Sequence, residues 1–316
     1  MEQIYLAPME GVTDNIYRKT FIEYYGGVDK FFTPFLSPNA NLKFTTREFD
    51  EIDPEKNPVE ITVPQLLTNN AKHFLWAAGE IIQMGYKEIN FNLGCPSGTV
   101  VAKKKGSGLL FYPELLDEIL YEIFEKLPSL CKGDQKVPKI SIKSRLGKCD
   151  PEEFYDILDI YNKYPISQLT LHPRIQSDFY REPIRKEFID YTLSHARAKV
   201  VLNGDIKTVS HIKAAEESYP ALDGIMIGRA LISNPMLALD YKNSPTDFDE
   251  RKFQEFQQEL LRQYEIRFSG EKPVLHRMKE FWSFWQERYP KDASAIKHIK
   301  KSKSISDYRN ALRELT

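Results

Sequence analysis

The feature that most constrains the fold is the alternation of short β-rich runs with longer amphipathic stretches between residues 4 and 227. Strands that alternate with helices predict a parallel sheet with crossover helices. Eight such strands favour an α/β (β/α)8 barrel, and no Gly-rich dinucleotide or P-loop motif supports an open sheet. The predicted strands are 4–7, 30–33, 61–66, 88–92, 139–143, 168–172, 199–203 and 224–227, and the predicted helices are 71–84, 113–127, 151–163, 184–194 and 210–218.

The pattern changes after the eighth strand. Residues 243–247 (Asn-Ser-Pro-Thr-Asp) are typical of a linker, and no strand pattern appears from Phe248 to Thr316. We therefore predict a catalytic barrel over residues 1–242 and a small helical unit over residues 248–316. The segment 247–316 holds 15 Lys and Arg against 12 Asp and Glu, with the positive charge concentrated in 297–303. Such a run is usually a solvated helix face, but it also suits contact with a polyanion.

Composition excludes several classes of protein. The 316 residues are 41% hydrophobic and 28% charged, as in an ordinary globular protein, and a net charge of -1 does not suit a chain that is basic throughout. No apolar run is long enough for a membrane helix, and no signal peptide is apparent. The cysteines, only 3 in number, lack CxxC spacing, which argues against disulfides and a metal site. We expect a cytoplasmic protein, without membrane contact or an obligate protein partner, that is a monomer.

One loop combines a thiol with flexible and basic residues. Cys95 lies between Gly94 and Pro96 just after the fourth predicted strand, and 103–108 read Lys-Lys-Lys-Gly-Ser-Gly. A cysteine in such a turn is usually a small buried residue. Active sites of barrels, however, collect at the carboxyl ends of the strands. The loop therefore suggests chemistry performed beside a polyanion.

The other strand ends carry a consistent set of polar residues. Gln65 could pair with the edge of a heterocycle through its amide, and Lys143 could place a positive charge beside an electron-rich ring. Gly204 and Gly228-Arg229 follow the last two strands, where barrels often bind phosphate. Each residue alone has an ordinary structural explanation, but the set as a whole predicts an active site. The remaining strand-end candidates are Ala7, Pro8, Met9, Asn92, Arg145, His172, Asn203 and Asp205.

Four segments together identify a family. Residues 6–14 (LAPMEGVTD), 92–96 (NLGCP), 203–206 (NGDI) and 226–230 (MIGRA) make the chain similar to the tRNA-dihydrouridine synthases over nearly its whole length. The resemblance implies an oxidoreductase in which a barrel binds FMN, NADPH or NADH reduces the flavin, and a uridine flipped out of tRNA is reduced to 5,6-dihydrouridine. Hydride would pass from flavin N5 to C6 of uracil, and Cys95 would protonate C5 on the other face.

The resemblance also implies the roles of other residues. Ala7, Pro8 and Met9 would pack on the flavin, Gln65 would meet its ring edge, and Lys143 and His172 would lie near N1 and C2. Asn203, Asp205, Gly228 and Arg229 would hold the ribityl chain and phosphate. Cys95 has to remain a thiol in order to donate a proton, so we expect the lysines 103–105 to point away from it. The predicted tRNA contacts are Asn92, Lys103, Lys104, Lys105, Arg174, Arg277, Lys279, Lys300 and Lys301.

Two departures from the family pattern fall on loops that should face the RNA. His172 is followed by Pro173 and Arg174 where many members have Gly-Arg, and 175–183 lack a Tyr-x-Gly turn. These departures leave the target uridine open. Three alternatives remain: the same chemistry on ribosomal or messenger RNA, a dihydroorotate-dehydrogenase-like flavin barrel acting on a free pyrimidine, and a non-catalytic RNA-binding protein.

Overall fold

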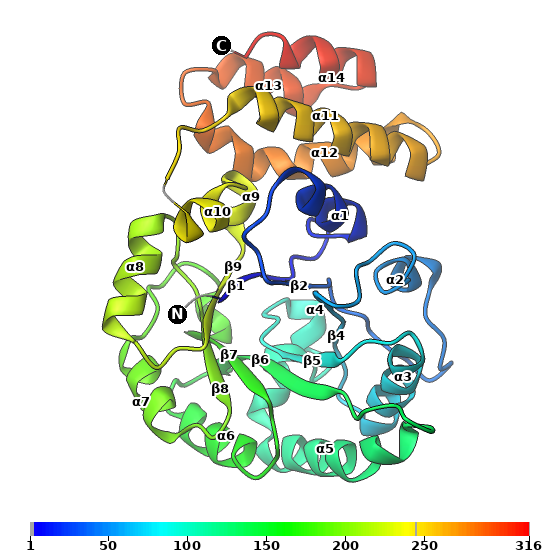
Figure 1. The fold of residues 1–316 in the computed structure, drawn as a ribbon, viewed down its shortest axis with the longest axis vertical. Helices are drawn as coiled ribbons and strands as arrows, with labels where there is room; N and C mark the ends of the chain where they lie inside the picture. Colours follow the sequence, from blue (N-terminus) through cyan, green and yellow to red (C-terminus); the bar gives the residue numbers. More distant parts are fainter. Residues whose placement is uncertain (1–2, 244, 316) are drawn as a thin grey trace.

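The computed structural model describes residues 3–243 and 245–315, and it confirms the barrel with a helical unit beside it (Figure 1). The strands are β1 (Gln3–Leu6), β2 (Lys30–Phe32), β3 (Thr62–Val63), β4 (Gln65–Leu66), β5 (Glu88–Leu93), β6 (Lys139–Gly147), β7 (Gln168–Ile175), β8 (Lys199–Asn203) and β9 (Gly224–Ile227). All neighbouring strands pair in parallel, in the order β3-β2-β1-β9-β8-β7-β6-β5-β4.

Pro64 divides the third predicted strand into β3 and β4. Val63 pairs with Phe32 of β2, whereas Gln65 pairs with Asn90 of β5. Proline has no N–H to donate, but its carbonyl accepts from Asn90 N at 2.8 Å. One short stretch of chain therefore bonds to both ends of the sheet and closes the ring.

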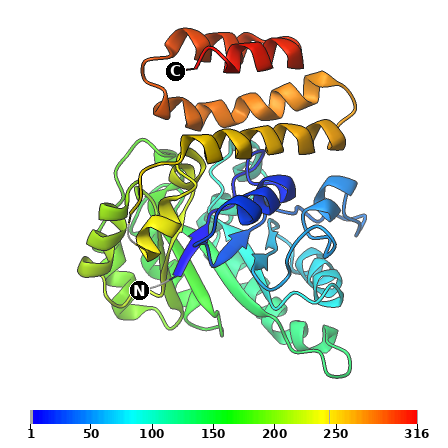
Figure 2. The same cartoon turned by 45° about the horizontal axis from the view of Figure 1, so that its top comes forward.

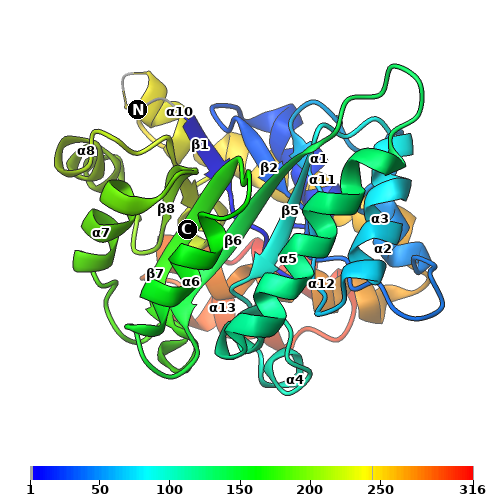
Figure 3. The ribbon, with the colours of Figure 1, turned by 90° about the horizontal axis from the view of Figure 1, so that it is seen from below.

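Helices cover the outside of the sheet (Figure 3). Successive residues of a strand point alternately toward the helices and toward the barrel interior. In β1, Ile4 and Leu6 pack toward the helices, whereas Tyr5 and the following Ala7 belong to a small separate cluster with Phe32. The barrel helices are α1 (Asn15–Tyr24), α2 (Thr46–Asp50), α3 (Ala71–Gln83), α4 (Gly98–Val101), α5 (Pro113–Lys126), α6 (Glu153–Tyr161), α7 (Glu187–His195), α8 (Val209–Ser218), α9 (Arg229–Ser233) and α10 (Leu237–Lys242), with short 3₁₀ turns η1 (Gly106–Phe111), η2 (Leu127–Leu130) and η3 (Gln176–Asp178).

The helical unit forms a layer against α1 and α9 (Figures 1 and 2). It contains α11 (Glu250–Arg267), α12 (Glu271–Trp285), η4 (Gln286–Arg288), α13 (Ala293–Lys301) and α14 (Ile305–Leu312). Tyr17 and Phe21 of α1 share one apolar cluster with Phe256 of α11 and Phe281 of α12. Tyr17 stacks on Phe281 with ring centroids 5.4 Å apart. The helical unit is thus continuous with the barrel core.

None of the helices in residues 3–243 and 245–315 has the length and apolar character needed to cross a lipid bilayer.

Candidate active site

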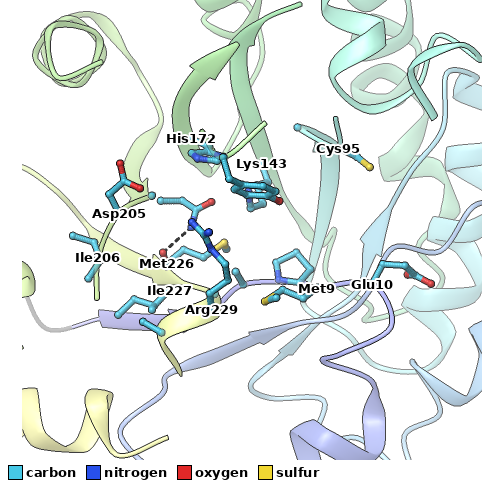
Figure 4. Close-up of a pocket in the computed structure, with 18 of the residues that line it drawn as sticks. Met9, Glu10, Cys95, Lys143, His172, Asp205, Ile206, Met226, Ile227 and Arg229 are labelled. Atoms are coloured by element: carbon cyan, nitrogen blue, oxygen red, sulfur yellow. Dashed lines mark hydrogen bonds between the residues drawn. The ribbon is translucent and has the colours of Figure 1, made fainter. Parts of the chain in front are cut away.

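The carboxyl ends of the strands surround a cavity of about 660 Å³, a volume within the usual range for an organic cofactor and substrate. In the close-up, Cys95 and Glu10 lie toward one end, Asp205 and Ile206 toward the other, and Lys143, His172 and Met9 between them (Figure 4). Every predicted flavin contact lines this cavity, as do Cys95 and Asn92: Ala7, Pro8, Met9, Gln65, Lys143, His172, Asn203, Asp205, Gly228 and Arg229.

The loop that carries Cys95 is held from several sides. Asn92 Oδ1 accepts from Cys95 N at 2.9 Å, and the carbonyl of Cys95 accepts from Ser107 N at 3.1 Å and Ser107 Oγ at 2.8 Å. Gly106 has φ +56°, and a Cβ there would lie 2.8 Å from the Cys95 carbonyl oxygen. Glycine is therefore required for the close approach of these two turns, which fixes the thiol at the cavity wall.

Cys95 retains its proton at neutral pH. Burial raises the pKa of this thiol above its ordinary value, and the opposing charges of Lys143 and Arg145 do not cancel that effect. Two of the nearby lysines have other partners: Lys104 Nζ lies over the ring of Tyr112, and Lys105 Nζ donates to Ser37 Oγ at 3.1 Å. The thiol is therefore suited to donate a proton.

A chain of buried amides forms part of the cavity wall. Gln65 Nε2 donates to Asn90 Oδ1 at 2.8 Å, and Gln65 Oε1 accepts from Asn92 Nδ2 at 2.8 Å. Gln65 and Asn92 line the cavity, and each retains an N–H that a ligand can use. Asn92, a predicted tRNA contact, is buried, so its observed role is to join Gln65 to the Cys95 loop.

Lys143 is a cation without an internal partner. Its side chain projects from β6 at the cavity, and within residues 3–243 and 245–315 its Nζ has no hydrogen-bond or ion-pair partner. Burial lowers the pKa of Lys143 to about 7, and the nearby positive charge of Arg145 acts in the same direction. A ligand that brought negative charge to Nζ would restore the charged form.

Arg174, a predicted tRNA contact, lines the cavity but is bonded within the protein. Its guanidinium is buried in the cavity wall, where it donates to His172 Nε2 at 2.8 Å and to both carboxylate oxygens of Asp205 at 2.8 and 2.7 Å. Its Nε also donates to the carbonyl of Glu182, so four of its five N–H groups have internal acceptors. The sequence pattern does not reveal this burial, because the ion-pair partner Asp205 lies 31 residues further along the chain, in the turn after β8.

The opposite end of the cavity is formed by the turns after β8 and β9. Asn203 Nδ2 donates to the carbonyl of Met226 at 2.8 Å, which joins the two strands at their ends (Figure 4). Arg229 is exposed and forms no ion pair among the residues that the structure describes; its guanidinium lies 4.9 Å from the centroid of the Tyr180 ring. This end therefore offers an uncommitted cation to an anionic ligand.

Two further parts of the wall were absent from the predicted site. Tyr180, 54% exposed, lies over the guanidinium of Arg145 at 5.4 Å, and Arg145 Nη2 in turn donates to Phe179 O at 2.7 Å. From the helical unit, Ser283 and Phe284 also line the cavity. The only sequence signal for Tyr180 was an aromatic pair in an otherwise polar loop, and no local pattern indicates that α12 reaches the barrel mouth.

The other predicted tRNA contacts lie outside the cavity. Two of them already have partners within the protein: Arg277 Nη1 donates to Glu280 at 2.9 Å, and Lys279 Nζ donates to the carbonyl of Ser302. Lys105 is likewise turned inward to Ser37. The residues that remain exposed are Lys103, Lys104, Lys300 and Lys301.

Comparison with known proteins agrees with this arrangement. The model of the dihydrouridine synthase (Dus) family matches residues 5–314. The tRNA-dihydrouridine(16) synthase of Vibrio vulnificus is 27% identical over 306 residues, covering 94% of this chain and 92% of that protein. The enzyme of the same name from Pseudomonas putida is 32% identical over 243 residues, covering 75% and 72%. A probable tRNA-dihydrouridine synthase of Staphylococcus aureus is 27% identical, covering 98% and 92%.

Solved structures with the same fold include morphinone reductase in complex with tetrahydroNAD, with a TM-score of 0.53 and 10% identity over 79% of this chain and 90% of that one. TcOYE with pHBA gives a TM-score of 0.51 and 8% identity over 76% and 88%. At this identity the likeness shows the fold alone. The match to the family model over nearly the whole length, together with the NLGCP loop that holds Cys95 at the cavity, shows that this chain belongs to the dihydrouridine synthase family of oxidoreductases.

Proposed function

We propose that this protein reduces a uridine of tRNA to 5,6-dihydrouridine, with FMN in the cavity and NADPH as the reductant. The observation that carries the proposal is that a half-buried cysteine, Cys95, lines the same cavity as an unpaired lysine, Lys143. Reduction of a uracil ring requires a proton at C5 when hydride arrives at C6. A positive charge beside the ring that supplies the hydride stabilises the reduced, electron-rich form of that ring.

The cavity fits FMN in its charge pattern. Lys143 Nζ and the Arg229 guanidinium have no anionic partner among the described residues, and they lie toward different parts of the same cavity. Lys143 would face the electron-rich pyrimidine edge of the flavin, and Arg229 would bind its phosphate. Ala7 and Met9 would pack on the ring. The flavin supplies hydride when bound.

Cys95 would supply the proton that C5 of the uracil receives. Burial keeps the thiol protonated, so Sγ–H can donate to C5 of a uracil stacked over the flavin. Hydrogen bonds to Asn92 and Ser107 hold the loop in place, which limits the reorganisation needed at the moment of transfer. A positioned general acid typically contributes about 10²- to 10⁴-fold to the rate.

RNA would dock on a rim patch made of Lys104, Phe111, Tyr112 and Lys148. Phe111 is 47% exposed, Lys148 Nζ lies 4.6 Å from its ring centroid, and Lys104 Nζ lies 4.3 Å from that of Tyr112. Ammonium groups neutralise phosphates, and exposed rings stack on bases. Because η1 bonds to the Cys95 carbonyl through Ser107, the patch is joined rigidly to the catalytic loop.

The test is to incubate the protein and NADPH with tRNA from cells that lack it, and to weigh the nucleosides by mass spectrometry. A gain of two hydrogens on a uridine supports the proposal. Position 16 is the first to map, since the Vibrio and Pseudomonas relatives carry that number in their names. Yellow protein that oxidises NADPH but leaves tRNA unchanged would redirect the search to ribosomal or messenger RNA, or to a free pyrimidine.

A further inference from the structure

Arg174 is a buried cation that the proposed reaction does not use. Its Nη1 lies 2.8 Å from His172 Nε2, its Nη2 bonds to both oxygens of Asp205 at 2.8 and 2.7 Å, and its Nε donates to the carbonyl of Glu182. A guanidinium has donors and no acceptor. His172 Nε2 must therefore accept this hydrogen bond through its lone pair.

His172 is neutral in this setting. Burial lowers its pKa well below the ordinary value, and the positive charges of Lys143, Arg145, Arg174 and Arg229 act in the same direction. The carboxylate that could oppose them, Asp205, is paired with Arg174. A neutral imidazole carries a single proton. Since Nε2 accepts from Arg174, that proton resides on Nδ1.

We propose that Arg174 is a positioning residue that fixes His172 as the neutral Nδ1–H tautomer, so that the imidazole presents a hydrogen-bond donor to the cavity. His172 lines the cavity, and its Nδ1 has no partner in residues 3–243 and 245–315. Asp205 holds the guanidinium in a two-point contact, which fixes its direction. The histidine is then a donor at every pH at which it is neutral.

The local backbone makes room for this arrangement. Gly204 has φ +129°, and a Cβ at this position would lie 3.0 Å from His172 Cδ2 and 2.8 Å from Ile184 Cγ2. The next residue, Asp205, has φ +53°, a left-handed conformation that L-residues rarely adopt. The strained turn is what brings the Asp205 carboxylate to Arg174.

The inference rests on the proposed function for the identity of the ligand. Lys143 Nζ and the Nδ1–H of His172 line the same cavity, so both can donate to the edge of a flavin that gains electron density on reduction. A donor at that edge stabilises the reduced form. Replacement of Arg174 should therefore make the midpoint potential of the bound flavin more negative, as well as change the tautomer.

The experiment is a long-range ¹H–¹⁵N correlation spectrum of the full-length protein with labelled histidine, with the His172 signal assigned by its loss in His172→Gln. It is recorded with and without FMN. The expected result is a protonated Nδ1 and an unprotonated Nε2 that persist through neutral pH. An Nε2–H tautomer or an imidazolium in the wild type would overturn the proposal. The spectrum without FMN does not depend on flavin chemistry, so it separates this inference from the proposed function.

Variants supply the second readout. Arg174→Met removes the donor and should move the proton toward Nε2 and lower the flavin potential, while Arg174→Lys should partly restore both. Arg185→Met is the matched control, because Arg185 pairs with Asp178 in the same loop and makes no contact with His172. Equal changes in the tautomer and potential for Arg185→Met and Arg174→Met would overturn the proposal. If Arg174→Met does not fold, the wild-type spectrum and the Arg174→Lys variant still test whether His172 is the Nδ1–H tautomer.

Discussion

Trp285 of the helical unit donates its indole N–H to the backbone carbonyl of Ile232 in α9, 3.1 Å away. The adjacent residues form a second contact between the same helices, since Ser233 Oγ donates to the carbonyl of Phe284 at 3.2 Å. The helix that begins at Arg229 is thus packed against α12 through its last residues. Because Arg229 is the proposed phosphate contact, the helical unit supports the cofactor end of the barrel as well as enlarging the surface.

We predict that Trp285→Phe lowers both the free energy of unfolding and the affinity for FMN. The variant leaves the carbonyl of Ile232 buried without a donor, which typically costs about 1–3 kcal/mol. It also loosens the helix that carries Arg229. Urea denaturation measures the first effect, and titration of the flavin-free protein with FMN, followed by flavin fluorescence, measures the second.

Trp282→Phe is the matched control. Trp282 is equally buried on the same helix, but its indole N–H bonds to Tyr308 OH at 2.9 Å, within the helical unit. This variant should lose a similar amount of stability and keep its affinity for FMN. A parallel loss of affinity in both variants would show that general destabilisation, and not the contact with α9, is responsible.

Cys95→Ala should keep bound flavin and lose most of the uridine reduction. The substitution removes the proton donor and leaves the backbone contacts of Asn92 and Ser107 with residue 95 in place. A loss of about 10²- to 10⁴-fold in the single-turnover rate is expected for a general acid. Cys131→Ala is the control, since Cys131 follows η2 and does not line the cavity. Turnover near the wild-type rate in Cys95→Ala would remove the thiol from the mechanism.

The sequence predicts the barrel well because each strand is a buried apolar run between turn residues. The errors in strand length have local causes: β6 and β7 extend to Gly147 and Ile175, since Arg145 and Arg174 continue the strands with buried guanidinium groups. A sequence pattern assigns such residues to the surface. Burial of an arginine depends on acceptors from distant segments, and no spacing rule can reveal them.

The sequence pattern predicts a helical unit separate from the barrel, whereas the packing of the structure joins the two. The linker at 243–247 suggests an independent module, yet Tyr17, Phe21, Phe256 and Phe281 belong to one core cluster. A truncation after residue 247 would expose the rings of Tyr17 and Phe21 in α1 to water. Such a truncation therefore tests the stability of the barrel before it tests RNA binding, and point substitutions at the rim give a cleaner test.

The rim patch predicts a specific dependence of tRNA binding on salt. Lys104→Ala and Lys148→Ala should each reduce the slope of log K against log salt by about 0.7 to 0.9, because each removes one phosphate contact. Phe111→Ala should weaken binding by about 1–3 kcal/mol and leave the slope unchanged, since a ring stacks and carries no charge. Binding is measured by fluorescence anisotropy of labelled tRNA at several salt concentrations.

Lys126→Ala serves as the control for this series. Lys126 is exposed at the end of α5 and pairs with Glu122 at 2.6 Å, away from the cavity mouth. Its replacement should leave both affinity and slope unchanged, and so should Lys279→Ala, because Lys279 bonds to the carbonyl of Ser302. If the slope of log K against log salt is the same for Lys104→Ala, Lys148→Ala and Lys126→Ala, the tRNA does not bind at the rim patch.

Lys143 should make the flavin-free protein less stable at neutral pH than at alkaline pH. Its pKa is about 7 in the fold and about 10.4 in an unfolded chain. Between these values the unfolded state binds a proton that the folded state does not, so the free energy of unfolding rises with pH. Lys143→Met removes this contribution. The variant should exceed the wild type in urea midpoint most near pH 7 and progressively less toward about pH 10. A gap that stays constant across this range would mean that Lys143 titrates normally in the fold.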